Sequence, residues 1–417
     1  MTAALDHTLS HWHIVIAWLI FLASYLVFAI GRLPGTKIDR PAMAVIGAVL
    51  LFAFGVLGPK QAVASIDFPT LVLLFSMMLI VASLHLAGFF EWITRLAIEH
   101  LSARQLLPGV IFISGILSAF LVNDIVCLVM APLILGLCKR MGLKPVPHLL
   151  ALATASNIGS TATITGNPQN ILIGSISGIG YRDFLAHLGP VAILGLFADW
   201  ALLYWIHLRD GNGQAAQPMQ AEIADNREAE MHPGWPVAVS LGVLIGFLLG
   251  YPPALVAAIG GAVLLVQRRY SPRMIYGDVD WSLLMLFLGL FLIIGGAEQA
   301  GITEQLLRVA EKLNLQNYAI FTAVVTLLSN IVSNVPAVML LKGLLPQFHH
   351  PHHAWLMLAM SSTLAGNLTI TGSVANIIVV EKARAEAHIG FLEYMKIGVP
   401  VTVLTLLLGL GWLAMSS

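Results

Sequence analysis

Apolar segments of about 20 residues, the length of a helix that crosses a lipid bilayer, recur along almost the whole chain. The continuous ones predict membrane-spanning helices over residues 14–30, 41–58, 69–87, 184–207, 234–250, 252–267, 280–297 and 391–414. Hydrophobic residues make up 58% of the 417 residues and charged residues only 10%, whereas a soluble domain carries about 25% charged residues. The composition therefore excludes a soluble enzyme and a disordered scaffold, and it predicts an all-α polytopic membrane protein.

Four further apolar segments are interrupted by polar residues. Two of them, residues 107–138 and 317–345, carry a short polar stretch at their middle, and we expect each to enter and return as a re-entrant hairpin. The other two, residues 147–178 and 353–380, contain longer runs of Gly, Asn, Ser and Thr. We expect these two to be membrane helices that are broken near the middle of the bilayer.

Blocks of sequence recur in the same order in the two halves of the chain, which indicates an internal repeat. The matching positions are Asp67 with Asp280, Gly88 with Gly301, Glu91 with Glu304, Asn123 with Asn334, and Thr163-Ile164-Thr165-Gly166 with Thr369-Ile370-Thr371-Gly372. We therefore divide the chain into a first repeat at 1–207, a polar cytoplasmic linker at 208–233 and a second repeat at 234–417. Each half then has five crossings, so the second repeat is inverted relative to the first and the chain crosses the membrane ten times.

The distribution of basic residues predicts the orientation. If the N-terminus lies outside the cell, most of the 21 Lys and Arg residues fall on the cytoplasmic side, as the positive-inside rule requires. The first dozen residues carry no Lys or Arg and no small-residue cleavage site follows, so we expect a retained helix instead of a signal peptide. The prediction is a multi-pass protein of the inner (plasma) membrane with both termini outside.

Unwound backbone survives at membrane depth only where it lines a cavity or binds something. Inverted repeats with paired broken helices are typical of secondary transporters, whose sites lie near the middle of the membrane. The alternative is that these polar residues only hold transmembrane helices together. The predicted substrate and ion site consists of Asn123, Asp124, Asn157, Thr161, Thr163, Thr165, Asn167, Asn170, Ser333, Asn334, Asn367, Thr369, Thr371, Ser373 and Asn376.

Asp124 stands out among these residues because the second hairpin carries Val335 at the matching place. A carboxylate in the membrane costs roughly 2.5–3.5 kcal/mol on insertion scales, so we interpret Asp124 as the residue that carries a proton or neutralises a bound cation. Asp199 in a later span is the weaker alternative, and a structural role is favoured for it. We expect Asp67 and Asp280 to cap the helices that they precede.

The remaining polar features point to structure. Cys127 and Cys138 are expected to be packed free thiols, and the histidines 349, 350, 352 and 353 a solvated outer loop. We therefore predict no metal site and no cofactor, with a proton or sodium as the coupling ion. The sequence contains no phosphate-binding Gly loop with a Lys, so we expect no ATP-driven pumping by this chain itself. The formal net charge of +0 predicts no nucleic-acid partner.

Several motifs resemble the ion transporter superfamily, which includes arsenite efflux permeases, sodium-coupled dicarboxylate symporters and some sodium/proton antiporters. They are Asn123-Asp124 followed by Pro132, the run Gly166-Asn167-Pro168-Gln169-Asn170, and Ser333-Asn334-Val335-Pro336. The resemblance covers nearly the whole chain. It implies scaffold and transport parts, elevator-like alternating access in the lipid bilayer and frequent homodimers, and it allows a separate ATPase subunit as a partner.

Within this group, dicarboxylate symporters typically have Ser-Asn-Thr at each hairpin tip, whereas this chain has Val122-Asn123-Asp124 and Ser333-Asn334-Val335. The Asn-Asp pair is more similar to arsenite permeases. Arsenite is an uncharged trihydroxide near neutral pH, which neutral Asn and Thr groups can hydrogen-bond. The leading hypothesis is therefore proton-coupled efflux of arsenite and antimonite.

Three alternatives stay open. The first is a sodium-coupled symporter of a dicarboxylate or small inorganic anion, and the second is a sodium/proton antiporter. The third, a membrane-embedded enzyme, is disfavoured because His85 is the only histidine that the sequence places well inside a span, and no catalytic partner accompanies it. We expect a transporter and not an enzyme.

Overall fold

The structure is a computed structural model that describes residues 10–208, 232–266 and 269–416. Over these ranges the regular elements are helices, and an isolated β-bridge joins Arg32 to Asp39. The all-α fold expected from the sequence is confirmed. Five of the described helices are long and apolar enough to cross a membrane, and five shorter apolar helices accompany them. The predicted linker, residues 208–233, lies almost wholly outside the described residues.

The first half of the chain runs from α1 to a short π-helical turn that extends α10. Its helices are α1 (His11–Ile30), α2 (Arg40–Ala53), α3 (Pro59–Ser65), α4 (Phe68–Leu86), α5 (Phe89–His100), α6 (Leu106–Phe120), α7 (Asn123–Met141), α8 (Pro145–Ser160), α9 (Pro168–Ser177), α10 (Tyr181–Leu203) and η1 (Tyr204–Leu208). The segment predicted as the first hairpin is thus α6 and α7, which contact each other. The first predicted broken helix is α8 and α9.

The second half follows the same order, with 3₁₀ turns around its break. Its helices are α11 (Gly234–Leu248), α12 (Pro253–Leu265), α13 (Pro272–Gly277), α14 (Trp281–Gln299), α15 (Ile302–Glu311), α16 (Tyr318–Val332), α17 (Asn334–Leu341), η2 (Lys342–Gln347), α18 (Pro351–Leu364), η3 (Ala365–Asn367), η4 (Ile370–Gly372), α19 (Val374–Ala383) and α20 (Phe391–Met415). Here α16 and α17 form the segment predicted as a hairpin, and α18 and α19 the second broken helix.

Three predicted spans are shorter than the sequence suggested. The spans at 41–58, 234–250 and 252–267 correspond to helices of 14, 15 and 13 residues, below the roughly 20 that cross a bilayer perpendicularly. Local chemistry sets these ends. Gly55 adopts a φ of +70° just after α2, and Pro252 and Pro253 open α12, where a proline has no N–H to give to a preceding turn.

Four short helices were not expected from the sequence, yet they obey the same repeat. Helix α3 corresponds to α13 and helix α5 corresponds to α15, each pair starting 213 residues apart. Gly88 and Gly301 precede α5 and α15 with φ values of +75° and +71°, in the left-handed region that glycine enters without steric cost. The expected caps are confirmed, because Asp67 and Asp280 each accept a backbone N–H in the first turn of α4 and α14.

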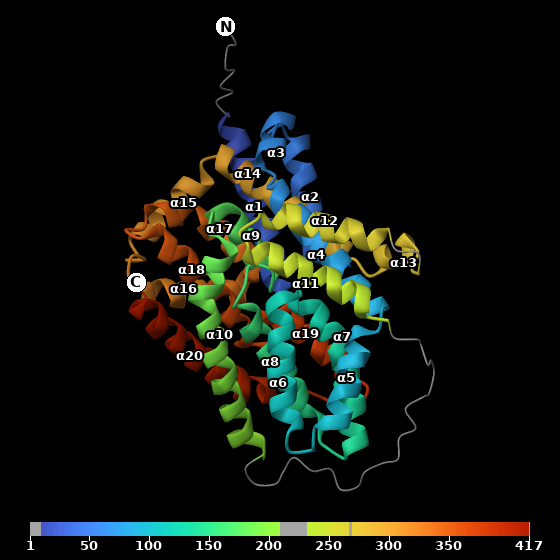
Figure 1. The fold of residues 1–417 in the computed structure, drawn as a ribbon. Coiled ribbons are helices and arrows are strands. Elements are labelled where there is room, and N and C mark those ends of the chain that lie inside the picture. Colours follow the sequence, from blue (N-terminus) through green and yellow to red (C-terminus); the bar gives the residue numbers. More distant parts are fainter. Residues whose placement is uncertain (1–9, 209–231, 267–268, 417) are drawn as a thin grey trace.

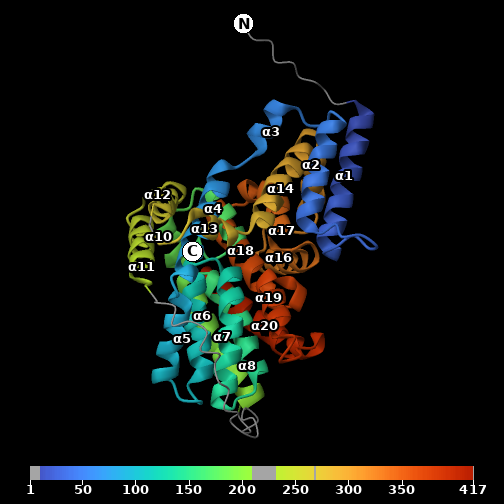
Figure 2. The same cartoon turned by 90° about the vertical axis from the view of Figure 1, so that its right-hand side faces the viewer.

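Several helix contacts between the two halves have counterparts in which the equivalent helices of the repeat have changed places. Helix α2 packs on α14, and its counterpart α12 packs on α4; likewise α8 contacts α19 while α18 contacts α9. A two-fold axis that relates the halves would produce this pattern of contacts. Figure 1 shows α5 to α8 together at the bottom of the view and α1 to α3 at the top, and Figure 2 shows α1, α2 and α14 side by side.

The broken helices occupy the interior. Nearly every residue of α8 and α18 is buried, although both contain polar side chains. In contrast, Leu19, Leu22 and Leu26 on α1 are 63%, 55% and 58% exposed, as expected for an apolar helix face that contacts lipid. The fold therefore places polar breaks at the centre and apolar side chains at the periphery.

Candidate functional site

The buried amide of Asn157, near the end of α8, joins three of the four polar segments. Its Oδ1 accepts hydrogen bonds from Asn123 Nδ2 and Ser373 Oγ, each at 3.0 Å. Its Nδ2 donates to Asn367 Oδ1 at 2.8 Å and to Asn376 Oδ1 at 3.0 Å. A primary amide offers two donor hydrogens and two lone pairs, so Asn157 uses its whole hydrogen-bonding capacity. We call these five residues the asparagine hub.

The second hairpin tip reaches the same place. A β-carbon at Gly366 would lie 3.5 Å from both Asn157 Nδ2 and Asn334 Nδ2, so the Asn334 amide is next to the hub. Ser333, just before it, has a φ of +78°, a left-handed conformation that is costly for a residue with a side chain. The backbone at this tip is therefore strained to present Asn334.

Two buried acceptors at the hairpin tips have no donor. Asn123 Oδ1 and Asn334 Oδ1 lack a hydrogen-bond partner within the described residues, and the two side chains are only 3% and 8% exposed. They occupy matching positions of the repeat. An unsatisfied buried polar atom costs about 1–3 kcal/mol, so a ligand that donates O–H groups, or a cation, would be stabilised here.

The backbone of each break is held by an asparagine that donates twice. Asn170 Nδ2 and Asn376 Nδ2 each donate to two carbonyl oxygens at distances between 2.7 and 3.1 Å. The acceptors are Ser160 and Thr163 in the first break and Gly366 and Thr369 in the second. Because the same pattern recurs 206 residues later, the two breaks share one local structure.

Gly166 allows the first break to close tightly. A β-carbon at this position would lie 2.2 Å from the carbonyl oxygen of Ser160, a distance that no real contact permits. The carbonyl of Gly166 in turn accepts the backbone N–H of Asn123 at 3.0 Å. This glycine therefore connects the first hairpin tip to the first break.

Several predicted site residues bond to their own surroundings instead of the hub. In the first break Thr161 donates to the Asn157 carbonyl and Thr163 donates to the Ala119 carbonyl. The Thr165 hydroxyl is hydrogen-bonded to the Tyr181 hydroxyl, and Asn167 caps α9. All four side chains are buried. In the second break Thr369 donates to Asn330 Oδ1 at 3.1 Å and lies 3.3 Å from the exposed Thr371. These hydrogen bonds stabilise the local conformation of the two breaks.

Asp124 lies in the first turn of α7, beside Asn123, and is half-buried. Its carboxylate accepts the backbone N–H of Ala375 in the first turn of α19, where the helix dipole favours a negative charge. The carboxylates of Asp124 and Asp280 are close enough to repel each other. Asp124 also lines a cavity of about 280 Å³. Asp124 is thus both a helix cap and a group exposed to a cavity.

Asp199 is linked to the asparagine hub through Thr154 and is fully buried. Its Oδ2 accepts from the Thr154 hydroxyl at 2.9 Å, and the Thr154 carbonyl accepts from Asn367 Nδ2 at 3.2 Å. Thr154 was not expected from the sequence, because one Thr in an apolar helix carries no signal. Asn330 and Thr363 were also missed, although Asn330 Nδ2 donates to the Ala365 carbonyl at 2.8 Å inside the second break.

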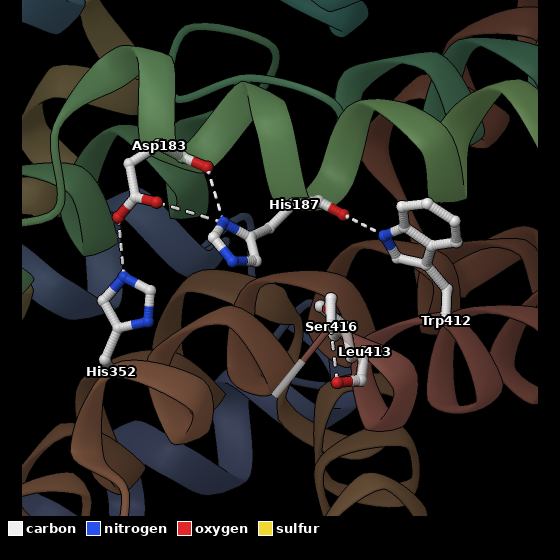
Figure 3. Close-up of polar contacts among 6 residues, drawn as sticks. All are labelled: Asp183, His187, His352, Trp412, Leu413 and Ser416. Atoms are coloured by element: carbon white, nitrogen blue, oxygen red, sulfur yellow. Dashed lines mark hydrogen bonds and ion pairs between the residues drawn. The ribbon is translucent and has the colours of Figure 1, made fainter.

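The histidine-rich segment at the start of α18 makes specific contacts, whereas a solvated loop was expected. His352 lies in the first turn of α18, and its Nε2 is 2.6 Å from Asp183 Oδ2 on α10, while His187 Nδ1 is 3.1 Å from Asp183 Oδ1 (Figure 3). Trp412 Nε1 on α20 donates to the His187 carbonyl at 3.0 Å. No set of three His, Cys, Asp or Glu side chains suited to a metal ion occurs in the described ranges. Cys127 and Cys138 are buried free thiols, as expected.

Comparison with known proteins finds a family profile and several relatives that cover most of this chain. A family profile described as "Citrate transporter" matches residues 25–365. The chain is 28% identical to the putative transporter arsB of Dictyostelium discoideum, over 94% of this chain and 89% of that protein. It is 29% identical to the silicon efflux transporter LSI3 of Oryza sativa subsp. japonica, over 95% of this chain and 97% of that protein. It is 30% identical to a 46 kDa membrane protein of Mycobacterium leprae, over 94% of this chain and 96% of that protein.

A solved structure is similar in fold. The crystal structure of the Alcanivorax borkumensis YdaH transporter, described as having an unusual topology, superposes with a TM-score of 0.53. The match covers 97% of this chain and 96% of that one, with 16% sequence identity. At this identity the likeness concerns the fold alone.

Proposed function

This chain belongs to the citrate transporter family, and from that premise we propose that it exports arsenite and antimonite in exchange for protons. The protein is a multi-pass membrane transporter, as the family and the apolar helices show. Within the family the substrate has to be argued from the site.

The observation that carries the proposal is the pair of unpaired amide oxygens, Asn123 Oδ1 and Asn334 Oδ1. Arsenite near neutral pH is an uncharged trihydroxide, so its O–H groups can donate to both oxygens while its own oxygens accept from nearby amides. The runs 156–170 and 366–376 and both hairpin tips contain no Lys or Arg. A multiply charged anion such as citrate would therefore meet no cationic side chain there, and the carboxylate of Asp124 would repel it.

Proton exchange fits the position of Asp124. Its carboxylate is bonded to the start of α19, a half-helix of the second break, and it is adjacent in sequence to the hub residue Asn123. Adding a proton removes the charge that stabilises this helix end, so protonation changes the interaction between the first hairpin and the second broken helix. This links proton binding to the elements that surround the solute.

Sodium coupling is the second candidate, and the same two oxygens favour it. Amide and backbone carbonyl oxygens coordinate hard cations, and the freed carbonyls of a broken helix do so in secondary transporters. In that case Asn123 and Asn334 would bind sodium, and the chain would act as a symporter of a small anion or as a sodium/proton antiporter.

Everted membrane vesicles distinguish these candidates. With an imposed pH gradient and no sodium, we expect arsenite to accumulate and to be lost when the gradient is collapsed. The double variant Asn123→Ala/Asn334→Ala should lose this accumulation, while Asn317→Ala, which removes only a cap of α16, should keep it. Absence of arsenite movement, together with sodium-stimulated uptake of an anion in right-side-out vesicles, would reject the proposal. Silicic acid, another uncharged hydroxide, should be tested beside arsenite.

A further inference from the structure

A cavity lined by several titratable side chains connects Asp124 to an unexpected histidine. The cavity, of about 280 Å³, lies between α4, α7, the segment before α14, and α19. Its titratable lining residues are His85, Asp124, Asp278 and Asp280, and no Lys, Arg or Cys is among the residues that line it. The sequence suggested that His85 lies well inside a span without a partner; instead it lies in the last turn of α4.

His85 is paired and half exposed. Its Nδ1 is 2.8 Å from Asp278 Oδ2, and the two side chains are 38% and 34% exposed. Asp280 already accepts the Leu283 N–H as the cap of α14, so Asp278 is the carboxylate available to the imidazole. An imidazole that faces a carboxylate with one nitrogen can bind a proton with the other, which is how histidine relays protons.

The cavity follows one face of α7 away from the hub. Asp124, Ile125, Leu128 and Val129 line it, and this spacing places them on adjacent turns of the same helix face. Asp124 is therefore at the end of the cavity beside Asn123, while Leu128, which is 41% exposed, lies one turn further out. The basic-residue distribution predicts that the ends of α4 and α14 near this cavity face the cytoplasm.

We propose that this cavity is the aqueous path between the cytoplasm and Asp124, and that His85 relays the coupling proton along it. During export the proton moves toward the cytoplasm: Asp124 gives its proton to water in the cavity, and Nε2 of His85 binds a proton from that water. The imidazole then gives the proton on Nδ1 to Asp278, which releases it to the cytoplasm. Each step moves one proton and leaves the heavy-atom bonds unchanged. The identity of the coupling ion in this inference rests on the proposed function.

The relay is tested by the pH profile of transport. In everted vesicles, His85→Gln should slow proton-driven arsenite accumulation about tenfold or more when the medium is acidic, because hydroxide that could accept the proton directly is scarce there, and less when it is alkaline. Added imidazole should restore the rate of His85→Ala. The matched control is His100→Gln on α5, whose exposed imidazole lies 3.0 Å from the Leu96 carbonyl oxygen and does not line the cavity, and it should behave as the wild type. A wild-type rate and pH profile in His85→Gln would overturn the relay while leaving proton exchange intact.

The aqueous path is tested without any substrate. In a chain whose two native cysteines are replaced by Ser, Leu128→Cys should react with a membrane-impermeant, charged thiol reagent added to everted vesicles. Leu407→Cys, 61% exposed on the apolar helix α20, should react far more slowly because lipid covers it. If Leu128→Cys stays unmodified, or reacts only in right-side-out vesicles, the path as proposed is wrong. If labelling succeeds but the wild type moves arsenite without protons, the proposed function fails and the cavity stands.

Discussion

The side-chain amide of Asn157 in the first broken helix donates to Asn367 Oδ1 in the second broken helix at 2.8 Å, although 210 residues separate them in the chain. Both amides are fully buried, at 1% and 0% exposure. A hydrogen bond in so dry an environment holds its partners firmly, because an unpaired polar group there would be costly. The two breaks therefore behave as one structural unit at the centre of the protein.

Replacing Asn157 should be among the most damaging changes at this centre. Asn157→Ala removes four hydrogen bonds and leaves several buried amides short of a partner, so we expect a loss of about 2–4 kcal/mol of stability and loss of transport. Thermal melting of the purified protein in detergent measures the first effect and vesicle accumulation the second. Thr161→Val is the control, because its hydroxyl bonds only to the Asn157 carbonyl one turn back. Equal melting temperatures for Asn157→Ala and the wild type would contradict the hub.

The sequence predicted which segments are broken but not how their side chains pair. Polar runs inside apolar segments are visible without a structure, and the recurring Asn170 and Asn376 marked the two breaks. The partners of Asn157 lie 34 to 219 residues away, so no local pattern records them. The threonines of the first break were expected to face solute, yet a Thr hydroxyl in or near a helix often bonds a carbonyl of its own segment.

The pairing of His85 with Asp278 was missed for a similar reason. The two residues are 193 apart, and the end of α4 falls before the apolar run in the sequence ends. The lengths of α2, α11 and α12 were also overestimated, because hydropathy continues through the turns that end these helices. Hydropathy reports which residues avoid water and does not report where the backbone turns.

The tight closure of the first break makes a glycine requirement testable. Gly166→Ala would place a β-carbon 2.2 Å from the Ser160 carbonyl oxygen, and backbone atoms cannot move aside cheaply. We expect a fall in melting temperature corresponding to about 2 kcal/mol or more, with reduced transport. Gly136→Ala on α7 is the matched control, since a β-carbon there meets no atom within 4 Å. The control should be neutral or slightly stabilising, by up to about 1 kcal/mol; similar losses in both variants would refute the steric argument.

The ion pair between Asp183 and His352 should contribute little to stability. Both side chains are 44% exposed, and exposed ion pairs are worth about 0–1 kcal/mol. A double-mutant cycle with Asp183→Asn and His352→Gln, followed by thermal melting at pH 6, should therefore give a coupling energy below about 1 kcal/mol. Raising the salt concentration should reduce it further. A coupling of several kcal/mol would mean that this contact between α10 and α18 holds the two helices together.

Asp124→Asn separates the two roles of this residue. The amide oxygen of Asn can still accept the N–H of Ala375, so the cap of α19 and the fold should persist, with a stability loss of about 1 kcal/mol from the missing charge at the helix end. The variant has no group that gains and loses a proton, so arsenite should still bind and exchange for arsenite across the membrane, while accumulation driven by a pH gradient should disappear. The control is Asp67→Asn, which alters the matching cap of α4 and does not line the cavity beside Asp124. Counterflow and gradient-driven accumulation, measured in the same vesicles, distinguish the outcomes. Wild-type accumulation by Asp124→Asn would show that Asp124 is only a helix cap and would direct attention to Asp199, the buried carboxylate behind the hub.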